Sequence, residues 1–178
     1  MADFATVAEL EVFMGSGSGS LGVRGTAMLG YASATIRLFT GQDVEVTTGR
    51  QESYAGDAWR DYLEVTQRPV TAVSAITIDA VAFTDFSWNR WGSIWRNDKA
   101  AWATGPILVT YDSGYATSED EYQAVKVVCL EVAARAIGGA PETFGLEAQE
   151  LRGPTPAIYL TDEEKDTLLS VLGKVVVA

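Results

Sequence analysis

The residue types that most often carry out catalysis are scarce in this sequence of 178 residues. It contains no histidine, which removes the commonest general base and the commonest metal ligand. The single cysteine, Cys129, lies on the apolar side of a predicted helix, where a buried structural thiol is expected in preference to a nucleophile. A lone cysteine also excludes an internal disulfide. We therefore expect that the chain is not an enzyme.

Two acidic runs could bind a divalent cation, but each has a structural explanation as well. Glu119-Asp120-Glu121 and Asp162-Glu163-Glu164 fall in the first turns of predicted helices, where carboxylates interact favourably with the helix dipole. The glycine-rich run Gly15–Gly22 lacks the Lys-Ser/Thr pair of a phosphate-binding loop, and no predicted strand precedes it. We expect no metal and no cofactor.

Charge limits the kinds of partner. Lys and Arg number 13 against 24 Asp and Glu, which gives a formal net charge of −11. A free-standing nucleic-acid binder needs a basic footprint, and the basic residues here do not cluster. One explanation for the acidity is solubility, because such a charge keeps monomers apart. Another is that DNA passes near the protein without adhering. The composition favours the first.

The apolar runs of the sequence are short and broken by Thr, Ser and Gly, so we expect no membrane span. The first residues carry acidic Asp3, Glu9 and Glu11 where a secretory signal would have a basic segment followed by an apolar one. We expect no such signal. The balance of 47% hydrophobic and 21% charged residues is that of a globular protein.

Helices are predicted near both ends of the chain. Capping boxes of the S/T-x-x-E type mark three of their starts, at Thr6, Ser118 and Thr161. Apolar residues recur at helical spacing, and Gly41 and Gly138 stand where C-terminal cap glycines belong. The expected helices span about 6–14, 21–39, 118–137 and 161–173.

Strands are predicted for the middle of the chain, over about 43–111. The runs are short, rich in Val, Ile, Thr and aromatic residues, and separated by Gly, Pro and Asp. Phe86–Arg90 and Ser93–Arg96 flank Gly92, which predicts an aromatic hairpin. Alternation should place Phe86 and Trp88 on one face of the hairpin, and Ser93 and Trp95 together on one face.

Three segments lack an apolar pattern of their own. The run 15–20 consists only of Gly and Ser and indicates a flexible linker, a mobile loop or an insertion at the surface. Residues 141–156 show no clear period, and 175–178 form an apolar tail. We expect neighbouring molecules to order all three.

An ordered set of motifs resembles a known family. Gln67-Arg68-Pro69-Val70 is followed by a Val/Ile/Thr strand, the aromatic hairpin, Gly105-Pro106-Ile107 with Val109-Thr110-Tyr111 and Gly114-Tyr115, and an acidic-capped, Ala-rich helix. Over roughly residues 6–137 this order resembles the head–tail connector (adaptor) family of tailed bacteriophages. The resemblance implies an α+β fold, namely a small, mostly helical bundle with an inserted antiparallel β region and aromatic hairpin, as a single domain over 1–178.

The resemblance also implies a role. Such a protein would be a structural virion component, assembled in the host bacterial cytoplasm, whose dodecameric ring lies in the virion neck between portal and tail. Its partners would be further copies of itself, the portal protein and the next neck or tail-completion protein. Genomic DNA would pass through the channel of the ring without specific binding.

Ring formation predicts the candidate interface residues. A subunit of a closed ring needs two different lateral faces as well as axial faces, and therefore more exposed apolar surface than a monomer. The candidates are Trp91, Trp95, Val175, Val176 and Val177. We expect one face of the hairpin to pack on the subunit's own helices while Trp91 or Trp95 contacts a neighbour.

A different class of function stays open: a Trp-rich β-type module that binds a carbohydrate or another small ligand. In that case Trp88, Trp91, Trp95 and Trp102 would form an exposed stacking platform. Capped helices at both ends of the chain favour the ring subunit, because carbohydrate modules usually consist of strands throughout.

Overall fold

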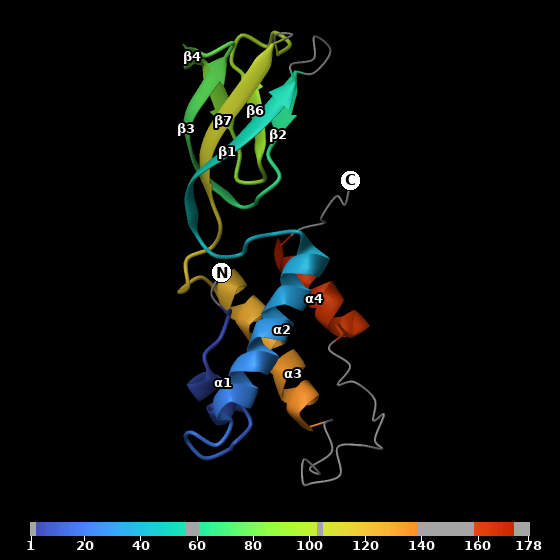
Figure 1. Cartoon of the computed structure of the whole chain (residues 1–178). Coiled ribbons are helices and arrows are strands. Elements are labelled where there is room, and N and C mark those ends of the chain that lie inside the picture. Colours follow the sequence, from blue (N-terminus) through green and yellow to red (C-terminus); the bar gives the residue numbers. More distant parts are fainter. Residues whose placement is uncertain (1–2, 56–60, 103–104, 139–158, 173–178) are drawn as a thin grey trace, which may run out of the picture. The chain divides into compact units, whose positions relative to one another are not determined.

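A computed structural model describes residues 3–55, 61–102, 105–138 and 159–172 (Figure 1). Its contacts divide the chain into two compact units. One unit comprises Met1–Gly41 and Gln123–Ala178 and contains the helices, whereas the other comprises Gln42–Tyr122 and contains the strands. The fold is therefore of the α+β class.

The helical unit is built from α1 (Val7–Phe13), α2 (Gly22–Thr40), α3 (Asp120–Gly138) and α4 (Asp162–Leu172), with the first residues of α3 still in the strand unit. These bounds lie close to the ranges expected from the sequence.

Capping explains where the helices begin and end. At α1, Thr6 N–H donates to the Glu9 carboxylate at 2.8 Å and Glu9 N–H donates to Thr6 Oγ1 at 3.3 Å. Thr161 and Glu164 form the same box at α4. At α3 the box expected between Ser118 and Glu121 is replaced by a 2.6 Å bond from Ala116 N–H to Glu119. Gly41, with φ 63°, ends α2.

Apolar side chains of all four helices form the interior of the helical unit. Cys129 belongs to this interior and its Sγ lies 3.5 Å from Ser33 Oγ on α2. Burial raises the pKa of the Cys129 thiol to about 11, so the expectation of a buried thiol is correct. The most completely buried apolar residues are Leu10, Leu29, Ala32, Ile36, Val125, Cys129, Val132, Ala133 and Leu168.

The Gly-Ser run differs from the flexible loop expected from its composition. Glu11 is only 4% exposed, and its carboxylate accepts hydrogen bonds from Gly19 N–H at 2.9 Å and Leu21 N–H at 3.0 Å. These backbone hydrogen bonds lower the pKa of Glu11. The end of the run is therefore held by a carboxylate of its own subunit.

The strand unit consists of two antiparallel sheets (Figure 1). The four-stranded sheet has the order β1-β7-β3-β4 and the three-stranded sheet has the order β2-β6-β5. The strands are β1 (Thr47–Ala55), β2 (Tyr62–Glu64), β3 (Val70–Ile78), β4 (Val81–Phe83), β5 (Phe86–Trp88), β6 (Ser93–Arg96) and β7 (Pro106–Ser113).

Both sheets contribute to one buried cluster. Alternate residues of β7 enter it, namely Ile107, Val109 and Tyr111, as the two-residue period of a half-buried strand requires. Leu63 of β2, Ile76 of β3, Ile94 of β6 and Trp102 complete its centre. The expectation of a mostly helical bundle is therefore wrong. The long β-branched runs pair with one another, and the middle of the chain has a core of its own.

The two motifs that best carry the family resemblance meet in the strand unit. Gly114 N–H donates to Pro69 O at 2.9 Å, and Val70 pairs with Ser113. The Arg68–Pro69 peptide bond is cis. Gly114 has φ 106°, and a Cβ atom there would lie 2.3 Å from the carbonyl oxygen of Glu45. Glycine is thus required by the packing of the strand unit.

Within the described residues, no helix combines the length and the apolar character needed to cross a membrane.

Candidate interaction surfaces

The aromatic hairpin is formed by β5 and β6, as the sequence predicts. Asn89 shapes its turn, because the Asn89 side-chain oxygen accepts from Trp91 N–H at 2.9 Å and from Ser93 N–H at 3.1 Å. Gly92 takes the left-handed conformation with φ 87°. Trp91 therefore lies at the tip of the hairpin, where 54% of its surface is exposed.

The inward face of the hairpin rests on the strand unit itself. Trp88 pairs with Ile94, which in turn pairs with Leu63 of β2. Phe86 and Trp88 both pack on the buried cluster between the sheets. The predicted alternation of the hairpin is correct, whereas the expectation that helices support it is wrong.

The outward face presents two neighbouring aromatic rings. Trp95 pairs with Ser87 on one side and with Tyr62 of β2 on the other. Trp95 is 37% exposed and Tyr62 is 49% exposed. Side chains of directly opposed residues lie about 5 Å apart at their Cβ atoms, so the two rings form one patch. Tyr62 was not among the expected interface residues, although the alternation of Tyr62, Leu63 and Glu64 places it outward.

The remaining candidates have different outcomes. Val175, Val176 and Val177 lie outside the described residues. Trp102 is fully buried and meets the Phe83 ring edge-on at 5.7 Å between centroids. Because Trp88 also packs inward, only Trp91 and Trp95 of the four proposed platform residues are exposed. The structure thus lacks the expected four-tryptophan stacking platform.

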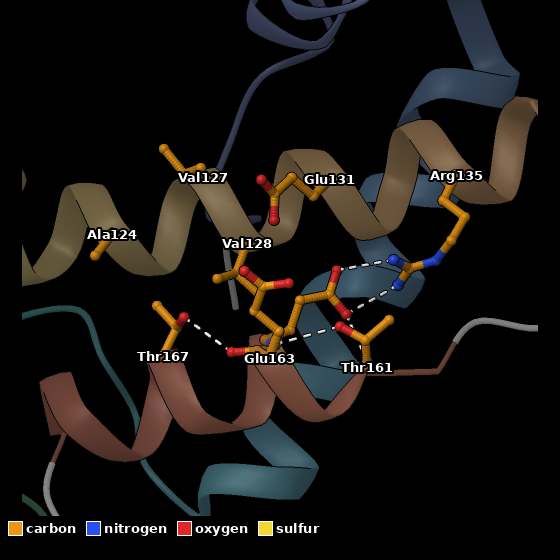
Figure 2. Close-up of a pocket in the computed structure, with 9 residues that line it drawn as sticks. Ala124, Val127, Val128, Glu131, Arg135, Thr161, Glu163 and Thr167 are labelled. Atoms are coloured by element: carbon orange, nitrogen blue, oxygen red, sulfur yellow. Dashed lines mark hydrogen bonds and ion pairs between the residues drawn. The ribbon is translucent and has the colours of Figure 1, made fainter.

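A groove that the sequence did not predict lies between α3 and α4 of the helical unit, with a volume of about 630 Å³ (Figure 2). Its apolar wall comes from α3, and carboxylates from both helices border it. The lining residues are Ala124, Val127, Val128, Glu131, Arg135, Thr161, Glu163, Glu164 and Thr167.

One end of the groove is closed by an ion pair (Figure 2). Arg135 donates two hydrogen bonds of 3.0 Å to the Glu164 carboxylate and a third, of 2.8 Å, to Tyr159 O. Burial by itself would raise the pKa of Glu164, but the hydrogen bonds from Arg135 and Thr161 outweigh it and the pKa is lowered. Arg135 is therefore engaged within its own subunit.

The other carboxylates of the groove are not neutralised in this way. Partial burial, together with the nearby Glu164 and Glu163 carboxylates, raises the pKa of Glu131 although Arg135 opposes this. Among the described residues, neither Glu131 nor Glu163 forms an ion pair. The described residues also contain no group of three or more His, Cys, Asp or Glu side chains that could hold a metal ion. The groove suits an apolar side chain or a cation with an aliphatic stem.

A cluster of polar groups surrounds the half-buried Glu52 of β1. Its carboxylate accepts hydrogen bonds from the hydroxyls of Tyr54 and Tyr111 and from the N–H and hydroxyl of Thr66. Burial tends to raise the pKa of Glu52, but these four donors lower it below its ordinary value. Burial and the adjacent carboxylate raise the pKa of both tyrosines. The cluster joins β1 and β7 to the segment that follows β2.

Comparison with known proteins gives a similarity of fold. No family model matches the sequence, and no curated protein matches it either. A solved structure does match: a chain of the "Virion of native gene transfer agent (GTA) particle", with a TM-score of 0.55 and 17% sequence identity. The match covers 98% of this chain and 91% of that chain. The two chains share a fold.

Proposed function

We propose that this protein is a structural virion component, and specifically a head–tail connector subunit whose ring lies between portal and tail and extends the DNA channel. The observation that carries the proposal is the fold shared with a chain of a virion particle over 98% of this sequence. The family resemblance supports it independently, since its two best motifs, Gln67–Val70 and Gly114–Tyr115, meet at one junction of the strand unit.

The exposed aromatic residues support a role in binding proteins. Trp91, Trp95 and Tyr62 expose between 37% and 54% of their surface on one small sheet and its hairpin. Tryptophan and tyrosine are enriched at interfaces and at the residues that dominate binding energy. A subunit that contacts neighbours on several sides uses such a surface.

The polar groups around Glu52 and the buried Cys129 favour a structural role over catalysis. A general base works best when its pKa lies near the operating pH, but the pKa of Glu52 is moved downward and those of its tyrosine partners upward. Each of these groups is also occupied by its neighbours. Cys129 is buried with a raised pKa, which opposes formation of the reactive thiolate.

The formal charge of −11 is consistent with a channel wall that DNA passes without adhering. A small-ligand module has less support, because Trp102 is buried and Trp88 packs inward.

Mixing the full chain with its cognate portal protein tests the proposal. Negative-stain electron microscopy should show rings on the portal, and virions should show density for the protein at the neck. Trp95→Ala and Tyr62→Ala should each weaken ring assembly by about 2 kcal/mol per contact or more, with unchanged circular dichroism. Val81→Ala is the matched control, because Val81 is 70% exposed on a different strand, β4.

Two results would contradict the proposal: a protein that stays monomeric beside its portal, and virions whose neck holds no density for it. Trp95 and Tyr62 would be core residues, not interface residues, if their alanine variants unfolded the monomer.

A further inference from the structure

Helix α2 is apolar on its outer side as well as on its inner side. Val23, Tyr31 and Leu38 are 88%, 58% and 87% exposed. At roughly 100° per residue, these three fall within an arc of about 80° together with the exposed Ala27 and Ala34. We call these five residues the α2 stripe. It lies opposite the buried Leu29, Ala32 and Ile36. A helix that is apolar all round is normally buried.

Charge is almost absent from α2. Arg24 and Arg37 are its only charged residues, and no acidic residue lies on it. Arg37 stacks on Phe4 at 4.3 Å from the ring centroid, at one edge of the α2 stripe, where Asp3 also lies beside Gly30. Arg24 borders the other edge, next to Tyr31 on the helical wheel, and one nitrogen of its guanidinium donates to Ile137 O at 3.0 Å. The α2 stripe is therefore an uncharged strip with one guanidinium at each edge, Arg37 beside Val23 and Arg24 beside Tyr31 on the helical wheel.

The groove between α3 and α4 has the complementary properties and opens on another side of the helical unit. Val127 and Glu131 each lie about 160° around α3 from Cys129, the residue that contacts α2 through Ser33. The groove thus faces away from α2. It offers an apolar wall and the carboxylates of Glu131 and Glu163, which have no ion-pair partner among the described residues.

We propose that the α2 stripe of one copy of this chain docks in the α3–α4 groove of the next copy, with Arg24 placed against Glu131 and Glu163. Two different surfaces on different sides of one unit make a head-to-tail contact, which closes into a ring when the rotation permits. This inference rests on the proposed ring function and assigns its lateral interface.

The small size of the α2 stripe suits a weak contact that is repeated around a ring. The fifteen helical steps from Val23 to Leu38, at 1.5 Å each, make the stripe about 22 Å long, and a width of about 10 Å gives an area on the order of 200 Å². A stable pairwise interface buries about 800 Å² per partner. One such contact is therefore too small for a lasting dimer, but it suffices when every subunit of a closed ring repeats it.

Cross-linking tests the contact. Ala27→Cys places a thiol in the middle of the α2 stripe, and Val127→Cys places one in the groove, whereas the native Cys129 is buried and serves as the unreactive background. The full chain carrying both substitutions is treated with a short bismaleimide, alone at high concentration and on the cognate portal, with ring formation followed by electron microscopy.

The double variant should give a ladder of covalent oligomers beyond the dimer, and each single variant should give none. Rings that yield no ladder would overturn the inference and leave the ring function standing. A ladder at high concentration without rings would support the contact and overturn the ring. If neither a ladder nor rings formed, both the inference and the ring function would be overturned.

The single variants exclude other occupants. Dimers from Ala27→Cys alone would mean that the stripe pairs with itself, and a link from a portal cysteine to either single variant would assign the surface to the portal. Either result overturns the inference.

Discussion

The carboxylate of Glu52 can be tested by a substitution that keeps its shape, Glu52→Gln. The carboxylate receives four donors: two tyrosine hydroxyls and the hydroxyl and N–H of Thr66. Glutamine retains one acceptor oxygen and replaces the other by an amide that can only donate. Two hydrogen bonds to a charged acceptor are lost, at about 1.5 kcal/mol each. We expect the free energy of unfolding to fall by about 3 kcal/mol.

The sign of the pH dependence follows from the pKa of Glu52. Its pKa in the folded protein lies below the ordinary value of 4.5, so the carboxylate stabilises the fold fully above that pH. The stabilisation is lost as the pH falls through the lowered folded-state pKa. Urea denaturation of the wild type and of Glu52→Gln should therefore differ at pH 7 and converge in acid.

Glu64→Gln is the matched control, because Glu64 is exposed on the neighbouring strand β2. It should change stability by less than about 0.5 kcal/mol. The reasoning would be refuted by a Glu52→Gln variant as stable as the control, or by a difference from the wild type that stays constant down to pH 3.

Three further outcomes are expected. Gly114→Ala should lower the free energy of unfolding in urea by more than about 1 kcal/mol, because Gly114 has a positive φ and its Cβ position lies against Glu45 O. Gly17→Ala should not lower it, because Gly17 has open space around it, and equal effects of the two substitutions would contradict this reasoning. Glu164→Gln should lower the free energy of unfolding, measured by calorimetry, by about 2 kcal/mol, whereas Asp162→Asn at an exposed position should leave it almost unchanged. If Glu164→Gln had no effect on stability, the pair with Arg135 would be dispensable. Cys129 should react with a maleimide only in denaturant, so rapid labelling of the native protein would disprove its burial.

Local sequence signals predicted the secondary structure well. The hairpin required only Gly92 between two aromatic runs, and its alternation correctly placed Phe86 and Trp88 on one face, which the fold then shows to be the inward one. The capping boxes at Thr6 and Thr161 fixed two helix starts. These features depend on residues close together in the chain, so no knowledge of the tertiary structure was needed.

Pairing between distant segments was not predictable in the same way. Tyr62 becomes an interface candidate only because β2 pairs with β6 and brings it beside Trp95. The burial of Trp102 likewise depends on the sheets that surround it. Composition misjudged the Gly-Ser run, since the feature that folds it is the side chain of Glu11 on the preceding helix.

The exposed apolar side of α2 and the groove between α3 and α4 were missed for a related reason. The helical spacing of apolar residues in 21–39 predicted a helix and made no assignment for Val23, Tyr31 and Leu38, which lie on the side opposite to Leu29 and Ile36. A sequence pattern identifies a helix with apolar residues on every side, and only the fold shows which side other helices cover. The groove beside Glu131 likewise depends on the tertiary structure, because α4, whose Glu164 is held by Arg135, forms its second wall.

Small contacts of this kind are suited to assembly that must wait for a template. One α2 stripe covers far less area than a stable dimer needs, so the free chain gains little by pairing. A portal that presents equivalent sites around a circle raises the effective concentration of each subunit for its neighbours. Closure then gives every subunit two lateral contacts, and removal of one subunit must break both. In the proposed ring, weak lateral surfaces would therefore permit a monomer before assembly and a stable ring after it.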